Sequence, residues 1–233
     1  MSELGPNEHA GEPVRGLPGH LPAGEHILWQ GAPDWRTLAR TALHTHLVGG
    51  YFGILAAWNT GSGLASGVPV AQAMGSGVVT LLAGALAIAL LTLYAWLAAR
   101  TTVYTMTNRR FVLRHGVALS KCFNIPYSAV ASAGLKLDAR GVGDIPLGLA
   151  GDAKIAYPHL WPHVRPWSFV NPQPMMRALP DAAAVAERLS LHLQQASSAA
   201  DRPFVVEPVR QPAARPSAVS SGTGASGGQP AAA

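Results

Sequence analysis

The stretch GVVTLLAGALAIALLTLYAWLAA, residues 77–99, decides the fold class of this 233-residue chain. Apart from threonine and tyrosine it carries no polar side chain, and Arg100 follows it directly. At about 1.5 Å per helical residue it extends roughly 35 Å, which is enough to cross a hydrocarbon core about 30 Å thick with some tilt. Tyr94 and Trp96 lie near its end, where aromatic side chains collect in membrane helices. We therefore predict a membrane-spanning helix.

A second, weaker span precedes this one. No Asp, Glu, Lys or Arg occurs between residues 41 and 99, so the charge-free run is long enough for two crossings. Residues 43–64 have the length of a span, although residues 59–63 (NTGSG) dilute its apolar character. A re-entrant or interfacial segment is the alternative for this first half. The prediction is a transmembrane helical hairpin at residues 41–99, with spans at about 43–64 and 77–99.

Basic residues flank the predicted hairpin on both sides, with Arg36 and Arg40 before it and a run that starts at Arg100 after it. The positive-inside rule then places both termini in the cytoplasm and makes the chain a multi-pass membrane protein. Residues 1–40 hold five acids, five prolines and no apolar core. They are therefore expected to form an N-terminal cytoplasmic segment and not a signal peptide.

Small residues recur at four-residue spacing in both spans: Gly49 with Gly53, and Ala83 with Ala87. Such spacing lets helix backbones approach closely, either inside the hairpin or against a partner helix, and a homo-oligomer is one such arrangement. The alternative is that glycine and alanine are simply common in membrane helices.

After Arg100 the pattern changes to short runs of period two with turn residues between them, which is typical of antiparallel strands. Residues 102–107 and 110–114 are expected to form a hairpin, and further strands are expected near residues 135–138, 145–149 and 154–157, with Pro146 favouring an edge strand. A helix should follow Pro180, because Val185, Leu189 and Leu193 share one helical face. Residues 100–196 are thus predicted to be a cytoplasmic β domain with a C-terminal helix, on which residues 25–40 pack, and residues 197–233 a disordered tail.

No arrangement of side chains indicates catalysis. The single cysteine, Cys122, excludes an intramolecular disulfide and a thiolate-rich metal site. His159 and His163 have the spacing of a helical metal site, but prolines at 158, 162 and 166 disfavour a helix there. No charged residue lies within the spans, where transport and proton relays usually need one. The expectation is a protein that is not an enzyme, with no catalytic residue, no metal and no cofactor.

The candidate contact residues are the basic side chains that follow the second span: Arg100, Arg109, Arg110, Arg114 and Lys121. They can simply orient the helix by the positive-inside rule, or they can form a face that attracts anionic lipid or a protein partner. Nucleic-acid binding is not expected, because no array of stacking aromatic residues accompanies them.

The order of these parts resembles a membrane-anchored bacterial pleckstrin-homology-like domain, and more closely the PuhB family of photosynthetic-complex assembly proteins. The segments that carry the resemblance are GEHILWQGAPDWRTLAR, RTTVYTMTNRR, GDIPLGLAGDAKIAYPHLWPHVRPW and PQPMMRALPDAAAVAERL. Together they extend over about residues 12–193, and HLWPHVRPW combined with the placement of the hairpin is the most specific of these features.

The resemblance implies an α+β membrane protein, in which a two-helix transmembrane hairpin joins a pleckstrin-homology-like antiparallel β domain with a C-terminal helix. It also implies a non-enzymatic factor of the bacterial inner (cytoplasmic or intracytoplasmic) membrane that assists assembly of the photosynthetic reaction centre and core light-harvesting complex. The implied partners are subunits of those complexes and membrane lipids. The competing hypothesis is a membrane-anchored lipid-sensing or general membrane-stress module of the same fold.

Overall fold

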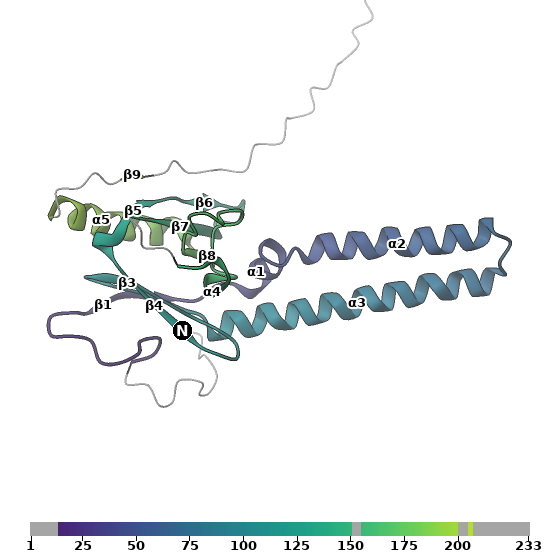
Figure 1. The fold of residues 1–233 in the computed structure, drawn as a ribbon, viewed down its shortest axis with the longest axis horizontal. Coiled ribbons are helices and arrows are strands. Elements are labelled where there is room, and N and C mark those ends of the chain that lie inside the picture. The colour runs from purple at the N-terminus through teal and green to yellow at the C-terminus, as the bar shows by residue number, and fades with distance from the viewer. Residues whose placement is uncertain (1–13, 151–154, 200–204, 207–233) are drawn as a thin grey trace, which may run out of the picture.

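A long pair of helices projects from one end of a β domain (Figure 1). The computed structural model describes residues 14–150, 155–199 and 205–206. The expectations for residues 1–13 and for most of the tail lie outside the described residues.

The β domain contains two sheets. The first is antiparallel throughout, in the order β1 (Ile27–Gly31), β2 (Val103–Thr107), β3 (Arg110–His115) and β4 (Lys121–Pro126). The second has the order β6 (Lys136–Leu137), β7 (Gly143–Leu149), β5 (Val130–Ala133) and β9 (Val205–Val206), and β8 (Met175–Leu179) also pairs with β7. A 3-10 turn, η1 (Tyr127–Ala129), links the two sheets.

The β2–β3 hairpin confirms the pattern read from the sequence. Its turn is fixed by Thr107, whose Oγ1 accepts hydrogen bonds from the backbone amides of Arg109 and Arg110 at 3.1 and 3.0 Å. Tyr104, Phe111 and Leu113 point into the core and are fully buried. This hairpin therefore forms where two segments with alternating apolar residues are joined by a turn that side-chain hydrogen bonds stabilise.

The C-terminal helix α5 (Ala182–Ala199) closes this core. Val185, Leu189 and Leu193 are at most 4% exposed and pack in the same cluster as the sheet residues, as the helical spacing predicts. The observed α+β domain with antiparallel sheets and a C-terminal helix agrees with the expected fold class.

The helices are inserted between two neighbouring strands. The chain leaves β1, forms α1 (Trp35–Thr41), α2 (Thr45–Ala65) and α3 (Val70–Thr101), and returns to pair β2 against β1. Asp34 begins α1, because its carboxylate accepts a hydrogen bond from the Thr37 amide at 2.9 Å. The segment before residue 41 is therefore not separate from the β domain, because β1 is an integral strand of the first sheet.

Small residues let α2 and α3 lie side by side. Gly84 lies so close to Phe52 that an added Cβ would come within 2.6 Å of that side chain, and Gly77 is similarly covered by Thr60. Gly49 lies next to Ile88 of α3. The glycines that pack the hairpin are therefore mostly Gly77 and Gly84, which the four-residue spacing in the sequence does not single out.

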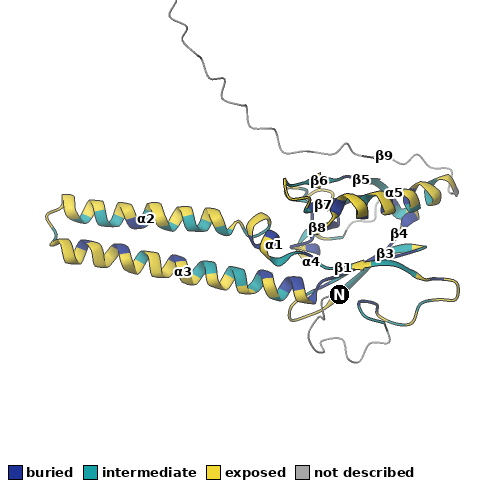
Figure 2. Ribbon diagram, turned by 180° about the vertical axis from the view of Figure 1, so that it is seen from behind, coloured by how far each residue is buried: buried dark blue, intermediate teal, exposed yellow. Residues whose placement is uncertain are grey.

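The described structure also shows where the hairpin meets the domain. The pairing of Gly49 with Ile88 and of Phe52 with Gly84 puts the start of α2 level with about residue 92 of α3. Beyond that level Ala95, Ala98 and Ala99 are buried, and Ala98 packs against Leu38 of α1. The last turns of the predicted 77–99 span are thus covered by the domain, as the buried residues at that end of α3 show in Figure 2.

By length and hydropathy, α3 is the one helix among the described residues that meets the criterion for crossing a membrane. The more polar α2 does not meet it. The two-span hairpin of the sequence analysis is therefore a helical hairpin in the structure, with one candidate span.

Three local expectations differ from the structure. Pro146 does not mark an edge strand, because β7 pairs with β5 and β6 on one side and with β8 on the other. Residues 155–157 do not form a strand, since a single helical turn, α4 (Tyr157–Leu160), begins there with proline in its first turn, while residue 154 lies outside the described residues. Ordered structure also continues past residue 196, because α5 reaches Ala199 and β9 pairs in parallel with β5.

Replacing Gly84 with valine should destabilise the hairpin, because the added side chain collides with Phe52. We expect a loss of about 1–3 kcal/mol in the free energy of unfolding, measured by helix circular dichroism in detergent. Gly53→Val is the matched control, since nothing lies within 4 Å of a Cβ at that position and the helix propensity change is the same. Equal losses in the two variants would contradict this packing.

Candidate functional site

The structure divides the basic residues predicted to form one face into two groups. Arg114 and Lys121 lie near the end of α3. Arg114 pairs with Val103, two residues after that helix, and Lys121 pairs with His115, the residue that follows Arg114. Arg109 and Arg110 lie at the opposite end of the β2–β3 hairpin. Because β2 has five residues, the two ends are about 17 Å apart. The five side chains therefore do not form a single contact surface.

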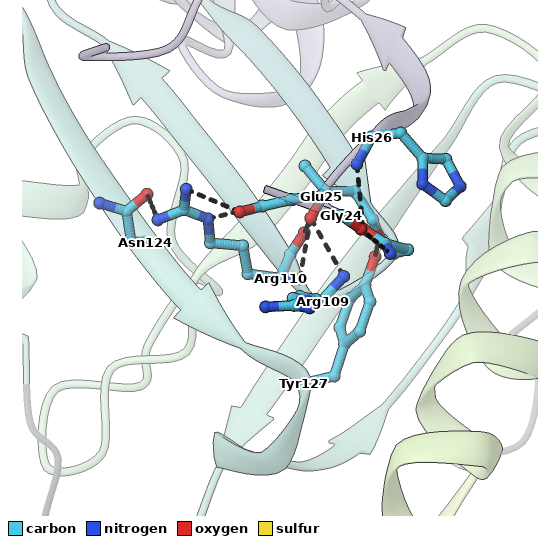
Figure 3. A network of polar contacts seen from close by, with 9 residues as sticks. Gly24, Glu25, His26, Arg109, Arg110, Asn124 and Tyr127 are labelled. Carbon is cyan, nitrogen blue, oxygen red and sulfur yellow. Dashed lines mark hydrogen bonds and ion pairs between the residues drawn. The ribbon is translucent and has the colours of Figure 1, made fainter. Parts of the chain in front are cut away.

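At the end of the β2–β3 hairpin that lies away from α3, Arg110 forms an ion pair inside the protein (Figure 3). Its Nε and Nη2 donate to the two carboxylate oxygens of Glu25 at 2.8 and 3.1 Å. The Glu25 side chain is only 2% exposed. A bidentate pair between a buried carboxylate and a guanidinium has strict geometry, so Arg110 holds the N-terminal segment to the sheet.

Asn108 reinforces this attachment from the hairpin turn. Its Oδ1 accepts from the His26 amide at 3.1 Å, and its Nδ2 donates to the Gly24 carbonyl at 2.9 Å. The backbone amide of Asn108 also donates to the His26 carbonyl. Asn108 and Arg110, on either side of Arg109 in the hairpin turn, thus bind residues 24–26 of the same chain and do not point away from the protein.

The charge of Glu25 is stabilised in the folded state. Burial opposes its ionisation, but hydrogen bonds from Arg110 and Thr107 and the positive charges of Arg110 and Arg109 outweigh burial and lower the pKa of Glu25 below its ordinary value of 4.5. The contact therefore favours the folded chain when Glu25 is ionised.

At the hairpin end, Arg100, Arg114 and Lys121 remain candidates for contact with lipid or a protein partner. Arg100 is exposed, and its guanidinium lies 4.6 Å from the centre of the Trp96 ring. Lys121 is exposed at the start of β4. Arg114 contacts Ser120 at 3.4 Å, so its position on the sheet is partly fixed.

The four predicted packing residues occupy different surroundings. Gly49 faces Ile88, whereas Gly53 has open space around it and Ala83 is exposed. Ala87 is half-buried. Gly53 and Ala83 thus lie on faces of the hairpin that no described part of the chain covers, and a partner helix stays the prediction for them.

A buried polar cluster joins the end of α3 to the domain, and the sequence analysis did not find it. His163 is fully buried, with Nε2 3.0 Å from the Thr102 hydroxyl and Nδ1 2.8 Å from the Tyr104 hydroxyl. Because the Thr102 hydroxyl donates to the Ala98 carbonyl, it accepts from Nε2, which assigns His163 as the neutral Nε2–H tautomer. Burial, followed by the nearby His115 and Arg177, lowers the pKa of His163.

This cluster is a structural joint between the hairpin and the domain. Among the described residues no group of three or more His, Cys, Asp or Glu side chains could hold a metal ion. His115 lies beside His163, with ring centres 5.2 Å apart, and burial lowers its pKa to about 4. Both rings are therefore neutral near pH 7, and they link β3, the loop after α4 and the last turn of α3.

The fold and its inserted hairpin define a class: an antiparallel pleckstrin-homology-like domain that carries a long apolar helical pair. The chain matches the family described as "Bacterial PH domain" over residues 53–192. It belongs to the bacterial PH domain family, as the segment pattern in the sequence predicts.

One relative extends this comparison. The chain is 40% identical over 185 residues to a Rhodobacter capsulatus protein described as "Uncharacterized 23.7 kDa protein in puhA 5'region", and the match covers 77% of this chain and 84% of the relative. This similarity agrees with the resemblance to the PuhB family. No solved structure matches the chain.

Replacing Glu25 with glutamine should weaken the attachment of residues 24–26. We expect the free energy of unfolding at pH 7 to fall by about 1.5–3 kcal/mol, because charged hydrogen bonds to Arg110 are lost. Since the pKa of Glu25 is lowered by folding, the difference from wild type should be full above about pH 4.5 and should shrink as the pH falls below that value. Denaturant unfolding at several pH values measures it.

Arg140→Gln is the control for this experiment, because it breaks the exposed Arg140–Asp138 pair, whose side chains are 56% and 34% exposed. A loss under about 1 kcal/mol is expected there. If Glu25→Gln costs no more than Arg140→Gln at pH 7, the Glu25–Arg110 pair does not hold the N-terminal segment.

Proposed function

We propose that this chain is a non-enzymatic inner-membrane factor that assists assembly of the photosynthetic reaction centre and core light-harvesting complex. The observation that carries the membrane part is the surface of the helical hairpin. Large apolar side chains are exposed along both helices, including Tyr51 at 61%, Ile54 at 74% and Leu86 at 62%. A soluble monomer rarely exposes a continuous apolar surface of this kind, so lipid or protein must cover it.

The dimensions of the hairpin support a crossing by both helices. The 21 residues of α2 extend about 31 Å, close to the thickness of a bilayer core of about 30 Å. Its polar Asn59 bonds to Thr80 of α3 at 3.0 Å, so the least apolar part of α2 is satisfied inside the pair. We therefore propose that α2 crosses the membrane together with α3.

The proposed orientation keeps the β domain and both termini in the cytoplasm. Arg36 and Arg40 precede α2, and Arg100 ends α3, so basic residues collect at the domain end of the hairpin. Lipid-exposed positions such as Gly53 and Ala83 are then available to helices of a partner complex.

The assembly role itself rests on relatives. The R. capsulatus protein is described by its position in the puhA 5′ region, which is a photosynthesis-related gene context, and the PuhB resemblance covers most of the chain. The alternative is a lipid-sensing or general membrane-stress module with the same fold. The second test below distinguishes that alternative from the assembly role.

The first test concerns topology. Tags that carry a protease cleavage site are inserted at Asn7, Ser221 and Gly67, the last in the turn between α2 and α3. When protease is added to spheroplasts, the tags at Asn7 and Ser221 should both stay intact and the tag at Gly67 should be cleaved. The result follows from two crossings with basic flanks inside. Opposite results for Asn7 and Ser221 would leave α3 as a single crossing and reject the two-span hairpin.

The second test concerns assembly. Deleting the gene should reduce the near-infrared absorbance of assembled reaction centre and core antenna while pigment synthesis continues, because an assembly factor changes amounts of complex. A plasmid copy of the wild-type gene is the control and should restore the spectrum. Normal near-infrared spectra in the deletion strain would reject the assembly role and favour the lipid-sensing alternative.

A further inference from the structure

A pocket of about 480 Å³ opens where the helical hairpin leaves the β domain. Thr41 at the end of α1 and His44, the residue before α2, belong to its lining. The lining also includes Lys136 of β6, Arg165 and Trp167. The pocket therefore lies at the level where α2 begins, which in the proposed orientation is the headgroup layer of the cytoplasmic leaflet.

The lining of the pocket is predominantly positive. Among the described residues that line it are Lys136, Arg165 and Arg177 but a single carboxylate, that of Asp144, and Arg165 also donates to the Gln173 side chain at 2.9 Å. Asp144 is engaged inside the protein, because its Oδ1 accepts from the Ala178 amide at 2.9 Å. The pocket therefore favours an anion.

Arg177 adds a fixed positive charge to the lining of the pocket. The residue is only 6% exposed, and it donates to the Pro162 carbonyl at 3.1 Å and to the Thr41 carbonyl at 3.2 Å. These two contacts hold the guanidinium in place beside the pocket that it lines. Its charge therefore raises the positive potential inside the pocket without a direct hydrogen bond from its buried Nε.

The rim of the pocket is apolar and aromatic. Trp167, which lines it, is 87% exposed, and the nearby Phe169 and Val170 are 60% and 78% exposed. On the hairpin side of the same loop, Trp161 stacks on Tyr94 of α3 with ring centres 5.6 Å apart. Exposed aromatic side chains beside a membrane helix are typical of the bilayer interface, where one end of the ring is apolar and the other is hydrated.

We propose that this pocket binds the phosphate-bearing headgroup of an anionic phospholipid, while Trp167, Phe169 and Val170 enter the interface beside it. Charge, position and rim all point to this one occupant, and the inference rests on the proposed insertion of α2 and α3. The exposed Lys136 attracts the phosphate directly, while Arg165, whose Nη1 donates to Gln173, and Arg177, which is held by backbone carbonyls, add positive charge that is fixed in place. This site is distinct from Arg109 and Arg110, which lie at the far end of the sheet.

The test uses the purified full-length chain in a non-ionic detergent. It is titrated with short-chain phosphatidylglycerol, short-chain phosphatidylcholine and inorganic phosphate, and the unfolding temperature reports binding. Phosphatidylglycerol should bind at least about tenfold more tightly than the other two, because only it joins a headgroup of net negative charge to acyl chains. Equal binding of the two lipids would overturn the proposal, and equal binding of inorganic phosphate would assign the pocket to a free anion.

Variants distinguish the pocket from general charge. Lys136→Gln with Arg165→Gln should weaken phosphatidylglycerol binding by about tenfold or more. Arg109→Gln with Arg188→Gln removes two exposed positive charges elsewhere and should leave it within about twofold. Equal losses in both double variants would overturn the site. Lys136→Glu, at an exposed position, gives a second measurement that does not disturb the interior, and unchanged affinity in that folded variant would also overturn it.

Trp167→Ala separates the rim from the phosphate site. It should weaken binding of both lipids and leave the unfolding temperature without lipid unchanged, because Trp167 is almost fully exposed. If Trp167→Ala binds both lipids as tightly as wild type, the loop does not enter the bilayer interface. These measurements need no photosynthetic partner, so a failed lipid titration with a reduced near-infrared spectrum in the deletion strain would reject the pocket alone.

Discussion

The pairing of β1 with β2 is the constraint on which the rest of the structure depends. These strands are neighbours in the sheet, yet the whole of α1, α2 and α3 lies between them in the sequence. Closing so long a loop is entropically unfavourable, so the ends must be held by more than ladder hydrogen bonds. The buried Glu25–Arg110 pair and the three hydrogen bonds of Asn108 supply that attachment at the far end of the sheet.

The near end is held by packing and by the buried histidine cluster. Leu38 of α1 packs on Ala98 of α3 and Ala178 of β8, so both helical ends of the insertion meet the second sheet. Thr102, His163 and Tyr104 add directional hydrogen bonds across the same junction. The hairpin is therefore joined to the β domain at several points rather than through a flexible linker.

The sequence predicts the elements well where local physics decides them. Alternation and turn chemistry identify β2 and β3, and helical spacing identifies the buried face of α5. Features that depend on contacts between distant parts of the chain have no such local signal. Pro146 is typical of an edge strand because it has no amide proton, which is a local property, whereas β8, which pairs with the side of β7 opposite β5 and β6, comes from a later part of the chain. Arg110 is predicted to contact lipid or a partner for the same reason. Its actual partner, Glu25, is 85 positions away in the sequence, so no local pattern indicates the pair.

The division of the basic residues follows from the same geometry. In the proposed orientation, electrostatic attraction to a charged leaflet falls off within about 8 Å at physiological ionic strength. Arg109 and Arg110 lie about 17 Å beyond the end of α3 along β2, so they contribute little to that attraction and Arg110 instead stabilises the fold. Lys136 and Arg165, which are scattered among turns in the sequence, share a pocket with His44 at the start of α2. The charges able to act on a bilayer are therefore set by how the two sheets are placed at the base of the hairpin, and not by the density of arginine along the chain.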